Sequence, residues 1–183
     1  PGQQGGTAVA EVLFGDYNPA GKLPVTFYRN VSQLPDFEDY NMTGRTYRYM
    51  QDVPLFPFGY GLSYTTFGYG KTVLDKNELT AGQSLKLTVP VTNTGKRNGE
   101  EVVQVYLRKQ GDAEGPIKTL RAFKRVSIPA GKTVNVEFDL KDKELEWWDD
   151  QSNTVRVCPG NYDIMVGGSS KEEDLQRTTI AIK

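Results

Sequence analysis

Hydrophobic and polar residues alternate along most of the chain after about residue 68. In six segments apolar side chains recur at every second position, and turn-forming residues separate the segments. This period places one side of each segment on a core, as in a β-strand, and short strands at regular spacing are typical of an antiparallel β-sandwich. We therefore expect a sandwich over residues 68–183, with strands at residues 85–91, 101–107, 120–128, 134–140, 162–166 and 178–182.

Three short phrases between these segments refine the expectation. Residues 92–99 are polar and predict a hairpin loop between two strands, and the Pro-Ala-Gly stretch in residues 128–132 predicts a tight turn between the next pair. The phrase Pro159-Gly160-Asn161-Tyr162 resembles the tyrosine corner of immunoglobulin-like and fibronectin type III sandwiches. The fold class is therefore expected to be mainly β and fibronectin type III-like, with Tyr162 buried and its hydroxyl bonded to nearby backbone.

The first third of the chain follows a different pattern. Helical spacing relates the apolar residues Ala8, Val9, Val12 and Leu13, and Gly15 stands where a left-handed residue would end the helix. After a turn, alternating apolar residues predict a strand over residues 23–27, at an edge or beginning near Pro24, because proline cannot donate to a ladder. Residues 28–67 show little periodicity and predict an extended connector.

Composition excludes several classes of function. The 22 basic and 23 acidic residues give a net charge of -1, which offers no electrostatic footprint for nucleic acid or an anionic membrane. The chain has no histidine and one cysteine, so neither a zinc cluster, a histidine-based triad nor an intrachain disulfide is expected, and no cofactor or metal is predicted. Cys158, which precedes Pro159, is interpreted as a small, semi-buried apolar residue.

Glycine- and proline-rich phrases in the first 67 residues carry a family resemblance. They are Gly5-Gly6-Thr7-Ala8, residues 13–27 (LFGDYNPAGKLPVTF), Gly44-Arg45-Thr46-Tyr47-Arg48-Tyr49 and residues 57–67 (PFGYGLSYTTF). With these phrases the chain resembles the carboxy-terminal part of a family 3 glycoside hydrolase of the β-glucosidase or β-xylosidase type. The first residue is Pro1 and not methionine, as expected of a segment of a longer protein.

The resemblance implies a division of the chain and of the chemistry. Residues 1–27 would be the last helix and strand of an α/β domain, residues 28–67 its exit connector, and residues 68–183 the fibronectin type III-like domain. Both catalytic carboxylates of the family lie upstream of the part resembled, so no catalytic residue is assigned and no substrate-binding residue can be named. The parent would hydrolyse β-glycosidic bonds of an oligosaccharide with retention, and a periplasmic or secreted location would follow from the family.

Glycosidase chemistry needs two facing carboxyl groups, so each acidic cluster is a candidate pair. Adjacent Glu100 and Glu101 should point to opposite faces of a strand, and we interpret them as solvated charge. The acidic side chains of residues 172–174 are interpreted in the same way. The remaining clusters are Asp36, Glu38 and Asp39 in the connector, and Glu144, Glu146, Asp149 and Asp150 around the pair Trp147-Trp148. We favour solvated acids in both, with one tryptophan on the sandwich core.

The connector is rich in aromatic residues: Tyr47, Tyr49, Phe56, Phe58, Tyr60, Tyr64 and Phe67. Such rings could stack on sugars, or they could form a buried seam that fixes the connector between two domains. The seam is the favoured interpretation, with Tyr47 and Tyr49 on one side of an extended segment. The alternatives to a structural tail of a hydrolase are a free carbohydrate-binding module and an adhesion-type repeat. A free module would not need the phrases before residue 28, and an adhesion-type repeat predicts neighbouring copies of the sandwich, which this sequence does not contain.

Overall fold

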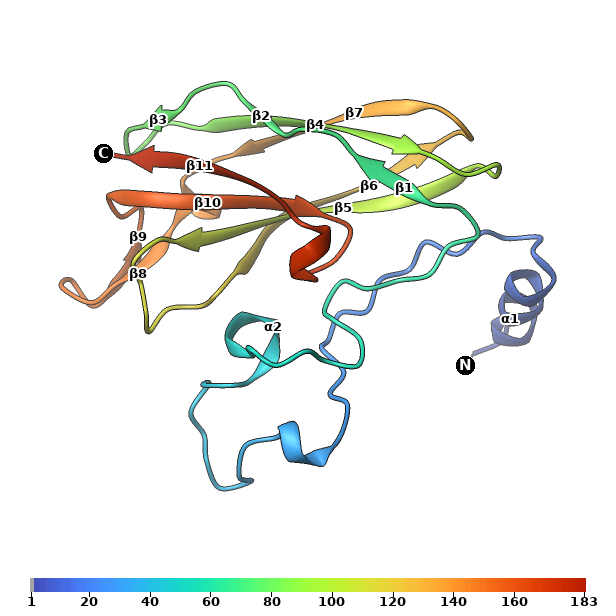
Figure 1. Ribbon diagram of the computed structural model, residues 1–183, viewed down its shortest axis with the longest axis horizontal. Helices are drawn as coiled ribbons and strands as arrows, with labels where there is room; N and C mark the ends of the chain where they lie inside the picture. Colours follow the sequence, from blue (N-terminus) through green and yellow to red (C-terminus); the bar gives the residue numbers. More distant parts are fainter. Residues whose placement is uncertain (1) are drawn as a thin grey trace.

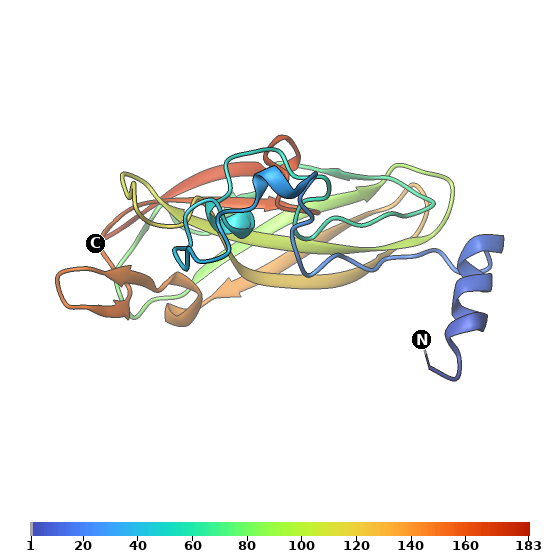
Figure 2. The ribbon, with the colours of Figure 1, turned by 90° about the horizontal axis from the view of Figure 1, so that it is seen from below.

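Two packed β-sheets form the body of the protein, and a long arm runs from an isolated helix to them (Figure 1). The structure is a computed structural model that describes residues 2–183. The helix α1 (Gly5–Phe14) stands away from the sandwich in two perpendicular views (Figures 1 and 2). Residues 15–66, called the arm here, lead from α1 to the first strand. No helix in residues 2–183 is long and apolar enough to cross a membrane.

The first sheet consists of four antiparallel strands. At its centre β4 (Leu85–Asn93) pairs with β1 (Phe67–Tyr69) and β2 (Val73–Leu74) on one side and with β7 (Thr133–Leu140) on the other. The second sheet has the order β3 (Glu78–Leu79), β11 (Gln176–Ile182), β10 (Gly160–Gly167), β5 (Gly99–Lys109) and β6 (Thr119–Ile128). Its strands are antiparallel except for the short parallel pair β3 and β11. All six strands expected from the alternation are present, and the mainly β fold is confirmed.

Of the two predicted connections between neighbouring strands, the hairpin is wrong and the tight turn is confirmed. Residues 92–99 do not close a hairpin, because β4 lies in the first sheet and β5 in the second. Residues 128–132 form the expected tight turn, with the Lys132 amide donating to the Pro129 carbonyl at 3.0 Å, and this turn passes from the second sheet to the first. Alternation reports which side of a strand is buried. It does not report which distant strand supplies the hydrogen bonds.

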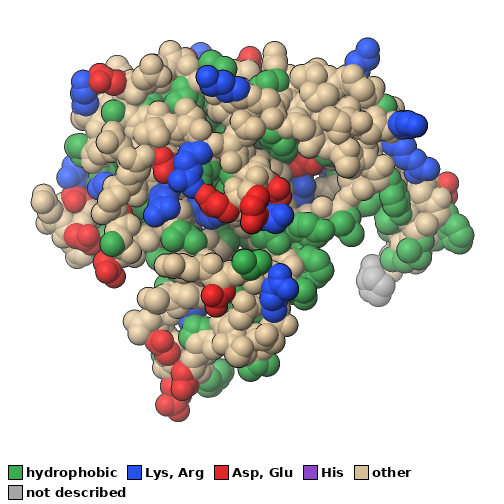
Figure 3. All heavy atoms as spheres, in the orientation of Figure 1, with side chains coloured by type: hydrophobic (Ala, Val, Ile, Leu, Met, Phe, Trp, Pro, Cys, Tyr) green, Lys and Arg blue, Asp and Glu red, His purple; other side chains and the backbone are tan. Residues whose placement is uncertain are grey.

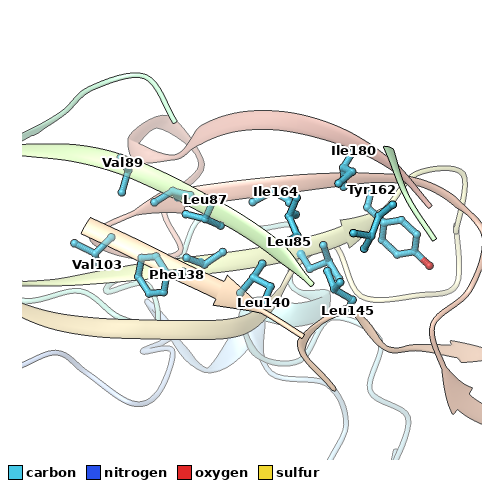
Figure 4. Close-up of a cluster of buried hydrophobic side chains, with 14 of the residues drawn as sticks. Leu85, Leu87, Val89, Val103, Phe138, Leu140, Leu145, Tyr162, Ile164 and Ile180 are labelled. Carbon is cyan, nitrogen blue, oxygen red and sulfur yellow. The ribbon is translucent and has the colours of Figure 1, made fainter. Parts of the chain in front are cut away.

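The core lies between the two sheets, as the alternation requires. Leu85, Leu87 and Val89 of β4 face Ile164 of β10 and Ile180 of β11, and all five are at most 1% exposed (Figure 4). Each such side chain contributes roughly 1.5 to 3 kcal/mol through removal from water. The helix α3 (Asp142–Leu145) and the hairpin of β8 (Trp147–Asp149) and β9 (Thr154–Arg156) close one end of this core through Leu145 and Trp147.

The expected tyrosine corner is confirmed. Tyr162 is 0% exposed, and its hydroxyl donates to the Cys158 carbonyl at 2.9 Å. Its ring meets Trp147 edge-on, with the centroids 6.1 Å apart. Burial raises the pKa of the Tyr162 hydroxyl, so it stays a donor at neutral pH. Cys158 itself is 2% exposed, which makes it a fully buried residue and not the semi-buried one expected.

Substitution of Tyr162 by phenylalanine is expected to lower the free energy of unfolding by about 1 kcal/mol. The ring would keep its packing, while the Cys158 carbonyl would lose its hydroxyl partner. Urea denaturation of the two proteins measures the difference. Tyr40→Phe is the matched control, because Tyr40 is 90% exposed and should not shift the midpoint. Equal midpoints for Tyr162→Phe and the parent chain would contradict the assignment.

The arm differs from the sequence expectation in two respects. No strand forms over residues 23–27; the segment makes one isolated bridge, between Phe27 and Phe56, and exchanges backbone bonds between Leu23 and residues 59–60. Pro24 lacks an amide hydrogen, and the partner segment bends at Gly59, where φ is +77°, so a regular ladder cannot continue. Residues 46–49 are not extended either, but form the helical turn α2 (Thr46–Tyr49).

The end of α1 is as the sequence predicts. Gly15 has φ of +82° and its amide donates to the Val12 carbonyl at 3.2 Å, which is the left-handed cap expected of a glycine there. The apolar face of the helix, in contrast, has no cover: none of the residues of α1 is buried. The arm also contains the short 3₁₀ helix η1 (Val31–Gln33).

Candidate functional site

The outer face of the second sheet is covered by the arm. Gln104 and Tyr106 of β5 point away from the core, yet they are 3% and 0% exposed. The Gln104 amide donates to the carbonyls of Gly59 in the arm, at 3.2 Å, and of Gly168, at 2.6 Å. Its oxygen accepts the Tyr106 hydroxyl at 2.6 Å. Both the nitrogen and the oxygen of the buried Gln104 amide thus have hydrogen-bond partners, and the bond to Gly59 fixes the arm to the sheet.

Gly59 is required at this contact. A side-chain carbon on residue 59 would lie 2.0 Å from the Gln104 oxygen, and the residue has positive φ. Glycine alone meets both demands, since it has no Cβ and tolerates the left-handed region. The phrase Pro57-Phe58-Gly59-Tyr60-Gly61 thus encodes an approach of the arm backbone to the sheet.

Aromatic side chains of the arm extend the same contact. The Tyr47 ring stacks on Phe58 with centroids 4.3 Å apart and meets Tyr106 edge-on at 5.9 Å. The Tyr47 hydroxyl accepts the Leu120 amide at 3.1 Å. The helical turn α2 makes this possible, because it turns Tyr47 onto the sheet while the Arg48 carbonyl accepts the Ile117 amide at 2.7 Å.

The buried aromatic seam expected from the sequence is present in part. Tyr47 and Phe58 are half-buried against the sheet, whereas Phe56 and Tyr64 are 39% and 45% exposed. The seam interpretation is therefore wrong for these last two rings. Burial ends where the arm leaves the sheet, a boundary that the spacing of aromatic residues does not reveal.

A buried ion pair holds the arm at a second place. The Lys22 ammonium lies 2.8 Å from the Glu101 carboxylate, and their side chains are 17% and 7% exposed. The Tyr69 hydroxyl of β1 donates to the same carboxylate at 3.3 Å. Burial, followed by the charge of Glu101, raises the pKa of the Tyr69 hydroxyl, so the phenol remains a donor. The contact joins the arm, the first sheet and the second sheet at one point.

Glu101 corrects the interpretation of its cluster as solvated charge. It shares the inner face of β5 with Val103 and Val105, so its carboxylate enters the end of the core, where Lys22 meets it. Glu100 points the opposite way, as expected, and pairs with Arg125. A carboxylate on the apolar side of an alternating strand was the signal in the sequence for a buried pair. Lys22 carried no such signal, because its partner lies far along the chain.

The acids around the two tryptophans behave much as expected. Trp147 is 3% exposed and donates its indole proton to Asp112 at 2.6 Å, whereas Trp148 is 49% exposed. Asp149 accepts Ser152 and Arg156, which lower its pKa to about 2. Asp150 is exposed, but Glu144, Glu146 and Asp149 are half-buried, so only part of this cluster faces water.

The two remaining clusters serve local structure. Asp36 and Asp39 accept backbone amides two residues ahead, at 3.1 and 2.9 Å, and stabilise turns of the arm. The backbone amide and the side-chain amide of Asn41 both donate to Asp39, and these two bonds lower the pKa of the Asp39 carboxyl. Glu172, in the exposed 3₁₀ helix η2 (Glu172–Asp174), pairs with Lys118 at 2.8 Å and with Arg177. That no carboxylate of the chain is catalytic remains a prediction.

Comparisons with known proteins agree with the resemblance noted from the sequence. Residues 1–64 match the model of the glycosyl hydrolase family 3 C-terminal domain, and residues 101–170 match that of the fibronectin type III-like domain. The chain is 55% identical over 182 residues to a xylan 1,4-beta-xylosidase of Xylanibacter ruminicola, an alignment that covers 100% of this chain and 21% of that protein. It is 38% identical to a periplasmic beta-glucosidase of Salmonella typhimurium, covering 92% and 24% of the two chains.

A solved structure shares the fold over the whole chain. The β-glucosidase of Erythrobacter marinus superposes with a TM-score of 0.84 at 42% identity, covering 100% of this chain and 24% of that one. The chain thus spans about a quarter of the length of the relatives it matches. The chain is a carboxy-terminal portion of a member of glycoside hydrolase family 3, and it contains a fibronectin type III-like domain.

Proposed function

We propose that this chain is the non-catalytic carboxy-terminal portion of an enzyme that hydrolyses β-glycosidic bonds of oligosaccharides, and that it docks onto the catalytic part through α1 and the start of the arm. The reaction of the whole protein would be retaining hydrolysis through a covalent glycosyl-enzyme, with a xyloside or glucoside as substrate. The names of the relatives support this activity.

The observation that carries the proposal is the distribution of exposed apolar side chains. On α1, Val9, Leu13 and Phe14 are 57%, 73% and 85% exposed, and in the arm Phe37 and Tyr40 are 93% and 90% exposed. In the sandwich, twenty buried residues form one hydrophobic core cluster, whereas α1 contains no buried residue. An isolated helix of this length is marginal in water, so α1 needs an apolar partner to stabilise it.

A division of the chain follows from the same proposal. Residues 1–27 would complete the α/β domain of the parent, residues 28–67 would be its exit connector, and residues 68–183 would be the sandwich. The match of residues 1–64 to a different family model from that of residues 101–170 supports a boundary between them. The start of β1 at Phe67 is consistent with the same boundary.

The test uses this chain together with a chain comprising the rest of the parent protein. Alone, this chain is expected to give no turnover of nitrophenyl β-xyloside or β-glucoside above background. Mixed with the rest of the protein, it should bind and raise the activity or the thermal stability of that part. Turnover by this chain alone, abolished by Glu144→Gln or Asp36→Asn, would overturn the proposal.

A pair of phenylalanines provides a matched control for docking. Phe14→Asp should weaken the association at least tenfold, because a carboxylate would enter an apolar contact. Phe123→Asp should have little effect, since Phe123 lies on β6, outside the proposed surface, and is 69% exposed. Equal loss of association in the two variants would contradict docking through α1.

A further inference from the structure

A groove lies between the arm and the sandwich, next to the contacts that fix the arm. Its volume is about 620 Å³, within the range of roughly 300 to 1,000 Å³ that is usual for small-molecule sites. One wall is formed by arm residues, namely Thr26, Arg29 and residues between 47 and 60, and the other by the end of β5, residues 117–118 and the loop at 170–174. The Ser170 amide donates to the Phe58 carbonyl at 2.9 Å, a backbone bond that joins the arm to the sandwich beside the groove.

The arm wall is aromatic and accessible. Phe56 and Tyr60 stack with centroids 5.4 Å apart and planes inclined by 25°, and Phe27 meets Phe56 edge-on at 6.2 Å. Phe56 keeps 39% of its surface exposed although it is held on two sides. These contacts fix Phe56 and Tyr60, which both line the groove. Rings held in this way bind a ligand without a large loss of side-chain entropy.

The sandwich wall is polar but balanced in charge. Lys118 is 6% exposed and donates to the Ser170 carbonyl and to Glu172, each at 2.8 Å, and Lys171 lies 3.5 Å from Glu173. The sandwich wall carries three basic residues, Arg108 and the two lysines, and the three acids of residues 172–174. The arm wall adds Arg29 and Asp52, so four basic and four acidic residues line the groove in total. Figure 3 shows side chains of both signs side by side above a band of hydrophobic side chains.

This combination restricts the ligand. A charged ligand would meet as many like as opposite charges, so the balanced wall gives neither an anion nor a cation a net attraction. A purely apolar ligand would leave the polar wall without hydrogen bonds. A neutral molecule with flat apolar faces and many hydroxyl groups satisfies both walls, because its C–H faces pack on the rings and its hydroxyls both donate and accept.

We propose that this groove binds a neutral oligosaccharide chain, with Phe56 and Tyr60 as the stacking platform and the charged side chains of the opposite wall as hydrogen-bonding partners of the sugar hydroxyls. The site holds a sugar chain and does not cleave it. Its position on this chain makes it independent of the docking surface on α1.

The experiment titrates xylotetraose and cellotetraose into the 183-residue chain and follows backbone amide resonances. Shift changes are expected at residues 50–60 and 170–174, with the same affinity at low and high salt because the ligand is neutral. Phe56→Ala is expected to weaken binding about tenfold. Phe56→Leu keeps apolar bulk in the arm but lacks a flat face, and it should also weaken binding. Weaker binding in both variants would then result from the missing ring face and not from a rearrangement of the arm.

Trp148→Ala is the matched control, because Trp148 is 49% exposed and lies on β8, outside the groove. It should leave the affinity unchanged. Absence of shift changes at millimolar oligosaccharide, or binding that Trp148→Ala abolishes and Phe56→Ala does not, would overturn the proposal. Binding that weakens steeply with salt would also overturn it. If Phe14→Asp did not affect docking, the proposal of docking through α1 would be wrong. The proposal that the groove binds an oligosaccharide would stand, because its test does not involve Phe14.

Discussion

Replacement of Lys22 by methionine is expected to lower the free energy of unfolding by about 3 kcal/mol. The change leaves the Glu101 carboxylate, which is 7% exposed on its side chain, without its cation at the end of the core. Removal of one partner from a buried pair is costly because the remaining charge stays desolvated. Urea denaturation followed by tryptophan fluorescence measures the effect.

Two further variants test whether burial is the cause. Lys183→Met removes the cation of the exposed pair with Glu78, whose side chains are 67% and 62% exposed, and should cost under about 1 kcal/mol. The double variant Lys22→Met with Glu101→Leu should recover most of the loss, since no charge is then buried. Equal effects of Lys22→Met and Lys183→Met would show that the pair does not act as a buried contact.

Replacement of Tyr106 by alanine is expected to cost about 3 to 5 kcal/mol and to release the arm from the sheet. The ring is 0% exposed between β5 and Tyr47, and its hydroxyl orders the Gln104 amide that holds Gly59. Chemical denaturation measures the first effect, and limited proteolysis in residues 47–60 measures the second, because released backbone is cleaved faster.

Tyr106→Phe separates the two contributions. It retains the ring and removes only the bond to Gln104, so a cost of about 1 kcal/mol is expected, with little change in proteolysis. If Tyr106→Ala loses stability while the arm remains as resistant as in the parent chain, the ring supports the sandwich and not the arm.

Local patterns in the sequence predicted much of the fold. Alternation located the six long strands, Gly15 marked the end of α1, and the phrase around Tyr162 identified the buried corner. These features depend on residues close to one another along the chain, where the side-chain period and the steric demands of glycine and proline act directly. The glycine- and proline-rich phrases also indicated the family, which the comparisons confirm.

The contact of the arm with the sandwich was not predicted in this way. Gln104 and Tyr106 lie on the outer face of β5, so alternation assigns them to solvent, but the arm packs against them and they are buried. The register shift between Val105 and Tyr106 also lies in this stretch, where five consecutive residues are buried. A strand that is covered on both faces loses the periodic signal on which sequence analysis relies.

The sequence by itself therefore determined where the six long strands lie, where the helix ends, that Tyr162 is buried and to which family the chain belongs. Tertiary structure alone decided that β4 and β5 lie in different sheets, that Lys22 neutralises Glu101, and that the arm forms one wall of a groove. The reason is physical. Secondary structure follows from the conformational preferences and periodicity of neighbouring residues, whereas pairing, charge neutralisation and cavities depend on residues brought together from distant parts of the chain.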